Sequence, residues 1–190
     1  MRRDQLEHAI RTACQIIGRD EVIVVGSQAI LGTYNEHDLP SAATLSREVD
    51  VLPIADTNEE TALLADEIEG VAGELSLFEE THGYSIDGVD LSTSVLPAGW
   101  RDRLVKVQNA NTAPPGDDRQ FTGWCLDRHD LCVAKLCAFR TKDQNFVGAL
   151  LDAGLVEAAV IDERLEAIAT DREHLATRAR AWLLARLQRG

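Results

Sequence analysis

The first residues of the chain repeat apolar side chains at helical spacing. The four that set the pattern, three or four positions apart, are Leu6, Ile10, Cys14 and Ile17. Side chains at these intervals lie on one face of an α-helix. The pattern predicts an amphipathic helix over residues 4–17 that ends at Gly18, a residue that tolerates the left-handed backbone common at helix ends.

Two strands are indicated by different patterns. Residues 22–25 are a run of β-branched apolar side chains, typical of a short buried strand, and a helix is expected to start directly after it at Ser27. The later stretch "REVDVLPI" alternates between apolar and polar positions. Its valines face a core, whereas Glu48 and Asp50 share the opposite face, because residues i and i+2 of a strand point the same way.

The remaining patterns predict a few more strands and then helices only. The expected elements are a helix over 57–69 capped by Thr57, a hairpin at Asp87-Gly88, strands in "RLVKVQ" and "FTGWCL", and helices over 129–140, 142–152, 162–169 and 171–188. We therefore expect an α+β fold, in which a small mixed or antiparallel sheet flanked by helices is followed by a C-terminal helical bundle. Residues 1–115 are expected to form the α/β core, and residues 116–190 a mainly helical part packed on it.

Charge and composition narrow the class of protein. The 190 residues carry a net charge of −13, from 32 acidic and 19 basic side chains, which argues against general nucleic-acid binding. No apolar run approaches the roughly 18 residues of a membrane span, and the N-terminus has no continuous apolar segment of a signal peptide. We therefore expect a cytoplasmic protein, with its four cysteines reduced and no membrane partner.

The cysteines also raise the question of a metal site. Cys125, His129, Cys132 and Cys137 lie close together in the sequence. His129 and Cys132 can share a helix face, but Cys137, five residues further on, lies off that face. Buried thiols in a helix explain this spacing better than zinc ligands do.

The acids on the alternating strand point to different chemistry. Glu48 and Asp50 repel each other when they lie side by side, and carboxylate oxygens alone suit Mg²⁺ or Mn²⁺. Upstream, the amides of Gly26 and Ser27 can hold phosphate oxygens at the start of a helix. Each feature has an ordinary explanation, a solvated strand face for the acids and a turn with a cap for Gly-Ser. Together, in this order, they indicate phosphoryl or nucleotidyl transfer.

At these residues the sequence resembles a known superfamily. The pattern "VVGSQAIL…SREVDV" is similar to the signature of DNA-polymerase-β-type nucleotidyltransferases. The segment "DLCVAKLCAFRTKDQNFVGALL" resembles the toxin-like branch, which includes abortive-infection nucleotidyltransferases, Men-type toxins and related domains of unknown function. The resemblance extends from about residue 22 to residue 151.

The resemblance implies a role for six residues. Gly26 and Ser27 match the phosphate-holding pair, Glu48 and Asp50 the metal-binding acids, Lys135 the lysine that contacts nucleotide phosphates, and Asp143 the acid of the second motif. Lys135 also stands among apolar residues, where an ammonium group needs an anion, although a lysine at a helix edge can extend to solvent. Two departures are a Glu where the first metal acid is usually Asp, and a longer loop before it.

A third carboxylate usually completes such a site and serves as the base. Asp87 and Asp90 are the candidates. The expected turn explains Asp87, so Asp90, on the strand expected after that turn, is preferred as the additional catalytic acid. A solvated strand acid is the alternative explanation for Asp90.

The resulting hypothesis is a metal-dependent transfer of NMP from an NTP to a macromolecular acceptor. The resemblance implies a toxin of a toxin–antitoxin pair that modifies tRNA 3′ ends, with Mg²⁺ or Mn²⁺ as cofactor and a cognate antitoxin as partner. A local basic track for tRNA could be built from Arg101, Arg103, Lys106 and Arg119. The alternatives are a protein or small-molecule acceptor, such as an aminoglycoside, and a catalytically degenerate antitoxin or regulator that keeps only the fold.

Overall fold

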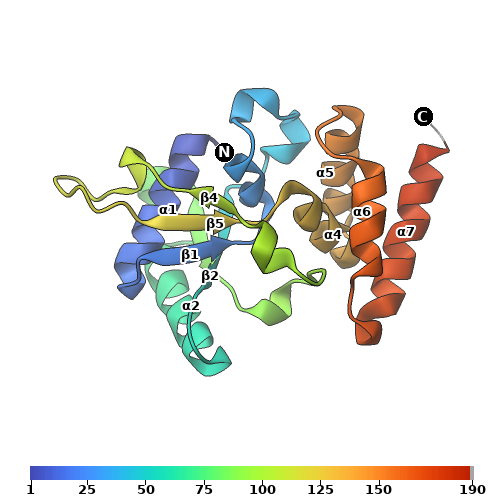
Figure 1. Ribbon diagram of the computed structural model, residues 1–190. Coiled ribbons are helices and arrows are strands. Elements are labelled where there is room, and N and C mark those ends of the chain that lie inside the picture. Colours follow the sequence, from blue (N-terminus) through green and yellow to red (C-terminus); the bar gives the residue numbers. More distant parts are fainter. Residues whose placement is uncertain (189–190) are drawn as a thin grey trace.

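The computed structural model describes residues 1–188, and these contain one mixed five-stranded sheet (Figure 1). Its strands are β1 (Glu21–Val24), β2 (Glu48–Pro53), β3 (Ser85–Gly88), β4 (Val105–Val107) and β5 (Thr122–Cys125). The strand order is β3-β2-β1-β5-β4. β1 runs antiparallel to β2 and parallel to β5, β2 and β3 are parallel, and β4 and β5 are antiparallel. The expected α+β fold with a small mixed sheet is confirmed.

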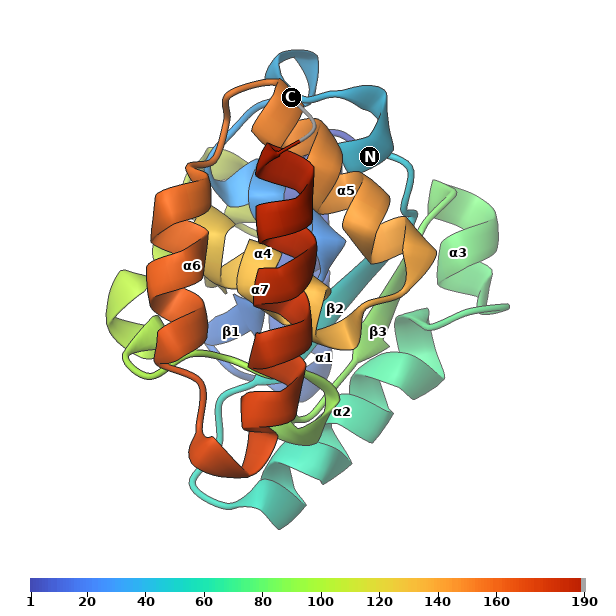
Figure 2. The same cartoon turned by 90° about the vertical axis from the view of Figure 1, so that its right-hand side faces the viewer.

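Helices surround this sheet and form the C-terminal part (Figures 1 and 2). They are α1 (Arg3–Ile17), α2 (Asn58–Ala72), α3 (Leu77–His82), α4 (Arg128–Ala138), α5 (Thr141–Asp152), α6 (Ala158–Glu166) and α7 (Glu173–Leu187). All except α3 match a predicted helix to within a few residues at each end. α1 ends at Gly18 with φ +62°, and the Thr57 side chain accepts a hydrogen bond from the Glu60 amide, as those caps predict.

The two faces of the sheet have different neighbours. α1 packs against β1, β2 and β5, and α2 packs against β2 and β3. The valines Val49 and Val51 are fully buried, in agreement with the predicted alternation along β2. The alternate positions of the same strand carry Glu48 and Asp50, which lie toward α4 and α5 and line a cleft there. The fold thus separates a packed face from a face that is available to a ligand.

Three local predictions differ from the structure. The Asp87-Gly88 pair is not a hairpin turn, because β3 pairs in parallel with β2 and ends at Gly88. The segment after Ser27 is a six-residue 3₁₀ helix (Ser27–Gly32), not an α-helix. The helical spacing of Ala179, Leu183 and Leu187 predicts a buried stripe along α7, but only the first two are buried and Leu187 is 56% exposed.

The division at residue 115 stays a prediction, but β5 bears on it. This strand comes from residues after 115 and is an internal strand of the sheet, between β1 and β4. One contiguous cluster of buried apolar residues also extends from α1 to α7. Among the described residues, no helix is long and apolar enough to cross a membrane.

Candidate active site

The site is built where β1 ends beside β2. The amide of Val25 donates a hydrogen bond of 3.0 Å to the backbone oxygen of Asp50, which fixes the next residue, Gly26, against the Asp50 side chain. A Cβ on residue 26 would lie 1.5 Å from Asp50 Oδ2 and 2.4 Å from Asp50 Cγ. Gly26 has φ −85°, which any residue can adopt, so the position requires glycine for space and not for its backbone angle.

The strand register gathers the acids on one face. In the parallel pairing of β2 with β3, Asp50 stands opposite Asp87 and Glu48 opposite Ser85. The Ser85 hydroxyl donates a 2.9 Å hydrogen bond to Asp87 Oδ1. The structure therefore brings Asp87, rather than Asp90, next to the predicted metal-binding pair.

Asp90 has a different environment. It lies beyond the end of β3, and its side chain accepts a 2.6 Å hydrogen bond from the amide of Ser92, so that it caps the 3₁₀ turn Leu91–Thr93. Hydrogen bonding by the Ser92 side chain, and then by its amide, holds the pKa of Asp90 below its ordinary value. The strand expected to carry Asp90 ends two residues earlier, because the pairing with β2 stops at Gly88.

Burial and charge repulsion set the ionisation of these acids. Burial raises the pKa of Asp50, and the nearby charges of Asp87 and Glu48 raise it further, while Lys135 opposes the shift. Burial likewise raises the pKa of Asp87, and the hydrogen bond from Ser85 opposes it. The negative charges of both carboxylates are therefore incompletely stabilised in the folded protein. A cation binds most favourably in this situation.

Lys135 reaches the site from α4. Its Nζ donates a 2.7 Å hydrogen bond to Ser27 Oγ and lies 3.3 Å from Asp143 Oδ1 and 5.3 Å from the centre of the Phe146 ring. The side chain is only 11% exposed. Burial lowers the pKa of Lys135, while Asp143 and Asp50 oppose that shift. Lys135 is therefore a buried ammonium group held directly beside Ser27, and not a lysine that extends to solvent.

Asp143 anchors this lysine. It is 1% exposed and receives hydrogen bonds of 2.6 Å and 3.2 Å from the Arg140 guanidinium. Burial pushes the pKa of Asp143 upward, but the hydrogen bonds from Arg140 and the charge of Lys135 outweigh it, and the pKa lies below its usual value. Asp143 thus orients Lys135 and Arg140, and this charged cluster makes its direct contact with Ser27 through Lys135.

A cleft of about 550 Å³ opens between the acids and this charged cluster. Ser27, Glu48, Asp50 and Lys135 all line it, together with Asp143. Six of the seven residues singled out in the sequence thus meet here, since Gly26 touches Asp50. The exception is Asp90, and neither Asp90 nor the other candidate base, Asp87, lines the cleft itself.

The predicted phosphate-holding role of Gly26 and Ser27 would need a different physical basis from the one expected. A 3₁₀ helix of six residues has few aligned peptide dipoles, so its N-terminus gives little attraction for an anion. The polar groups that the structure brings together here are the Ser27 hydroxyl and the Lys135 ammonium group. A lysine ammonium group carries a full positive charge, so it can make a charge-assisted hydrogen bond to a phosphate oxygen.

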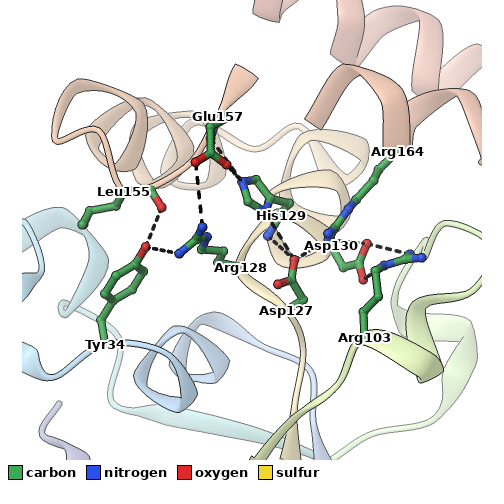
Figure 3. Close-up of polar contacts among 9 residues, drawn as sticks. All are labelled: Tyr34, Arg103, Asp127, Arg128, His129, Asp130, Leu155, Glu157 and Arg164. Atoms are coloured by element: carbon green, nitrogen blue, oxygen red, sulfur yellow. Dashed lines mark hydrogen bonds and ion pairs between the residues drawn. The ribbon is translucent and has the colours of Figure 1, made fainter. Parts of the chain in front are cut away.

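A network at the base of α4 holds this helix in place, and the sequence patterns did not indicate it (Figure 3). Asp130 is fully buried and receives hydrogen bonds of 2.9 Å and 3.0 Å from Arg103. Arg164, from α6, pairs with Asp130 at 3.1 Å and also with Asp127, the N-cap of α4. These pairs tie the 3₁₀ turn Trp100–Arg103 and α6 to the first turn of the helix that carries Lys135.

The same network continues to the segment before α6 (Figure 3). His129 Nε2 lies 2.6 Å from Glu157 Oε2, and the Tyr34 hydroxyl donates to the backbone oxygen of Leu155 at 2.7 Å.

The four cysteines are buried and free, as expected of thiols in a core. His129 contacts carboxylates instead of cysteines, which fits the explanation of the Cys-His spacing by packing.

The acids fit a hard divalent cation only together with a substrate. Within residues 1–188, no group of three or more His, Cys, Asp or Glu side chains is arranged to hold a metal ion. Mg²⁺ typically binds one or two carboxylates, and phosphate oxygens and water complete its shell. Glu48 and Asp50 meet that requirement, since both line the cleft and the Asp50 carboxylate receives no hydrogen bond from another side chain in the described part of the chain.

The comparisons with known proteins agree with this geometry. A family model described as "Nucleotidyltransferase of unknown function (DUF6036)" matches residues 4–182. The chain belongs to the DUF6036 family. The expected membership of a nucleotidyltransferase superfamily is thereby confirmed. No curated protein and no solved structure matches this DUF6036 chain.

Proposed function

We propose that this DUF6036 protein transfers NMP from an NTP to a hydroxyl acceptor with the help of Mg²⁺ or Mn²⁺. The observation that supports this most is the position of Asp50, held against Gly26 on one side of a cleft that Lys135 and Ser27 line from the other. A carboxylate that can bind a metal ion and a lysine that can bind phosphates thus line the same cleft. This arrangement matches the requirements of nucleotidyl transfer.

In this proposal each group has a separate task. Lys135 and Ser27 hold the β- and γ-phosphates, while Asp143 keeps Lys135 oriented. Glu48 and Asp50 would hold the divalent cation, which neutralises the charge of the triphosphate when it is bound. Asp87, with its raised pKa, accepts the proton of the attacking hydroxyl group.

The reaction is an in-line displacement at the α-phosphorus. The acceptor oxygen forms the new P–O bond as the bond to the bridging oxygen breaks, and pyrophosphate leaves. The Phe146 ring and Asn145 also line the cleft, whose volume suits a nucleotide. We therefore place the whole nucleotide on the α5 side of Asp50.

The resemblance to toxin-like members makes the tRNA 3′ end the first acceptor to test, and an antitoxin the corresponding protein partner. The charge distribution supports tRNA poorly. Residues 48–100 contain 13 acidic side chains and no lysine or arginine, so this segment repels a polyanion. In the expected basic track, Arg103 is paired with Asp130, and Arg119 is paired with Asp20.

The test of the proposed function does not depend on the acceptor. The protein is mixed with Mg²⁺ and each α-³²P-labelled NTP, with or without total tRNA, and released pyrophosphate and labelled products are measured. We expect one or more NTPs to bind with Mg²⁺ and to yield pyrophosphate, even if only slowly with water as acceptor. A protein that binds no NTP in the presence of Mg²⁺ or Mn²⁺ contradicts the proposal and indicates a degenerate regulator.

A further inference from the structure

A second cavity adjoins the cleft and shares several of its residues. It has a volume of about 450 Å³, and it shares Asp50, Lys135 and Arg140 with the cleft described above. Gly26 and the loop after β3 complete its walls near Asp50. Asp50 and Lys135 therefore stand where the two cavities adjoin.

The two cavities have different chemical linings. The cleft has two further cations, Arg47 and Lys142, as well as the Ser27 hydroxyl. Among the described residues, the second cavity has no cation except the shared Lys135 and Arg140, and both of these are paired with Asp143. Its other walls are mostly apolar, from Val89, Val95, Leu131, Ala134 and Leu175. The hydroxyl groups of Thr93 and Ser94 are its remaining uncharged polar groups.

The apolar lining continues away from the acids. A neighbouring cavity of about 320 Å³ shares Ser94 and Val95 with the second one and adds the apolar side chains of Leu91, Leu96, Trp100 and Ala169. Its two charged lining residues, Asp171 and Arg172, pair with each other at 4.0 Å. A ligand that fills both cavities is longer than one ring and meets mainly apolar side chains. Such a lining favours a neutral body, because burying charge without a partner is costly.

The geometry of displacement at phosphorus indicates which cavity binds the NTP and which binds the acceptor. The attacking oxygen must approach the α-phosphorus from the side opposite to the leaving pyrophosphate. The cationic cleft suits the triphosphate, so the attacking group must come from the apolar side of Asp50. From this geometry we infer that the second cavity binds the acceptor, a neutral alcohol with a mainly apolar body.

This inference rests on the proposed function and names its acceptor class. The alcohol oxygen attacks the α-phosphorus, its proton passes to Asp87, and pyrophosphate leaves toward Lys135 and Ser27. The products are a phosphodiester of the alcohol with NMP and one pyrophosphate. The NTP of the proposed function supplies the nucleotidyl group, and no other co-reactant is needed.

Two alanines provide a matched pair of variants. Ala134 lines only the acceptor cavity, and Ala42 lines only the cleft. Both are partly exposed in the free protein. Ala134→Phe fills the acceptor side, and Ala42→Phe fills the nucleotide side. The same change of side chain thus tests the assignment of each cavity, with circular dichroism and thermal unfolding to verify that both variants fold.

The probe alcohol is 4-phenyl-1-butanol, with glycerol as the polar control and total tRNA as a third acceptor. Formation of the NMP ester is measured by mass spectrometry, and NTP binding by calorimetry in Mg²⁺. We expect saturable ester formation with 4-phenyl-1-butanol and little with glycerol. Ala134→Phe should raise the KM for this alcohol by about ten-fold or more and leave the Kd for NTP within about two-fold, whereas Ala42→Phe should raise the Kd for NTP.

Three results overturn the inference but leave the proposed function standing. The first is a loss of NTP affinity in Ala134→Phe as large as in Ala42→Phe, which assigns the second cavity to the nucleotide. The second is labelling of tRNA with no ester of 4-phenyl-1-butanol, and the third is release of pyrophosphate with equal use of glycerol. If the unmodified protein binds no NTP, the proposed function itself fails, and this inference fails with it.

Discussion

The Asp50 carboxylate occupies the space in which a side chain of residue 26 would stand. A Cβ there would be 1.5 Å from Oδ2, far inside van der Waals contact. Gly26 and Asp50 are thus one packed unit, although 24 positions separate them in the sequence. Neither residue can be enlarged without displacing the other.

Gly26→Ala should therefore damage the site directly. The new methyl group displaces Asp50, at a cost of about 1–3 kcal/mol in the free energy of unfolding, and transfer should fall with it. Thermal unfolding and pyrophosphate release measure the two effects. Gly70→Ala is the matched control: it lies in α2 with nothing within 4 Å of the added methyl group, so its stability should be equal or higher. A stable and active Gly26→Ala variant contradicts the close packing.

Asp50→Asn should abolish transfer and keep the fold. Burial raises the pKa of Asp50, so its contribution to stability is present at low pH and is lost as the pH rises through the folded-state pKa. The asparagine variant lacks this loss, and its melting temperature at neutral pH should equal or exceed that of the unmodified protein. Melting curves between about pH 4 and pH 8 test this.

The raised pKa of Asp50 also makes the binding of a cation depend on pH. A cation needs the ionised Asp50, so Mg²⁺ affinity should increase as the pH rises through the raised pKa of this carboxyl group. Calorimetric titration with Mg²⁺ and a non-hydrolysable NTP analogue measures it. Near-normal transfer by Asp50→Asn rules out the metal assignment.

Lys135→Ala and Lys142→Ala separate a specific phosphate contact from a general positive patch. Lys135 is buried and bonded to Ser27, whereas Lys142 lines the same cleft as an exposed side chain. Loss of a charge-assisted hydrogen bond should raise the Kd for NTP by about ten-fold or more in Lys135→Ala. Lys142→Ala should change it much less, and equal effects of the two variants contradict a specific role for Lys135.

The third carboxylate is tested by Asp87→Asn against Asp90→Asn. Asp87 faces Asp50 across β2 and β3, whereas Asp90 caps a 3₁₀ turn outside the cleft. We expect Asp87→Asn to lower the maximal rate strongly with little change in NTP affinity, and Asp90→Asn to retain transfer. The opposite order restores Asp90 as the base. Single-turnover rates separate chemistry from binding.

Local periodicity was sufficient for much of this architecture. The helical spacing of Leu6 and Ile10 predicted α1, and the alternation around Glu48 and Asp50 predicted both β2 and the face on which its acids lie. These patterns succeed because the side chains of one element share one environment. The packing of Lys135 against Ser27 was indicated only by the resemblance, since it joins segments 108 positions apart.

Pairing between strands was less predictable. Asp87-Gly88 has the composition of a tight turn, but Gly88 serves a different need: a Cβ there would be 1.9 Å from the backbone oxygen of Ala65 in α2. The dipeptide alone cannot distinguish a turn from a close helix–strand contact. The preference for Asp90 as the base depended on this turn, because the turn was taken to explain Asp87. The Arg103–Asp130 pair was also missed, because no local pattern links a loop to a helix start.

The division at residue 115 can be tested by fragments. A fragment of residues 1–115 lacks β5, so it leaves one edge of β1 and the whole of β4 without a partner. We expect this fragment to aggregate or stay unfolded, as judged by circular dichroism and sedimentation. A well-folded monomeric fragment supports an autonomous α/β core instead.

The position of β5 between β1 and β4 also determines when the sheet can be completed during synthesis. Glu21–Val24 pairs with Thr122–Cys125, so the first strand made waits about a hundred residues for one of its neighbours. Until then the nascent chain presents an open edge of β1, the strand that leads into Gly26 and Ser27. The candidate active site is thus completed late, when α4 follows β5 and supplies Lys135. A ribosome that stalls before residue 122 releases a chain with an unpaired strand and no assembled active site.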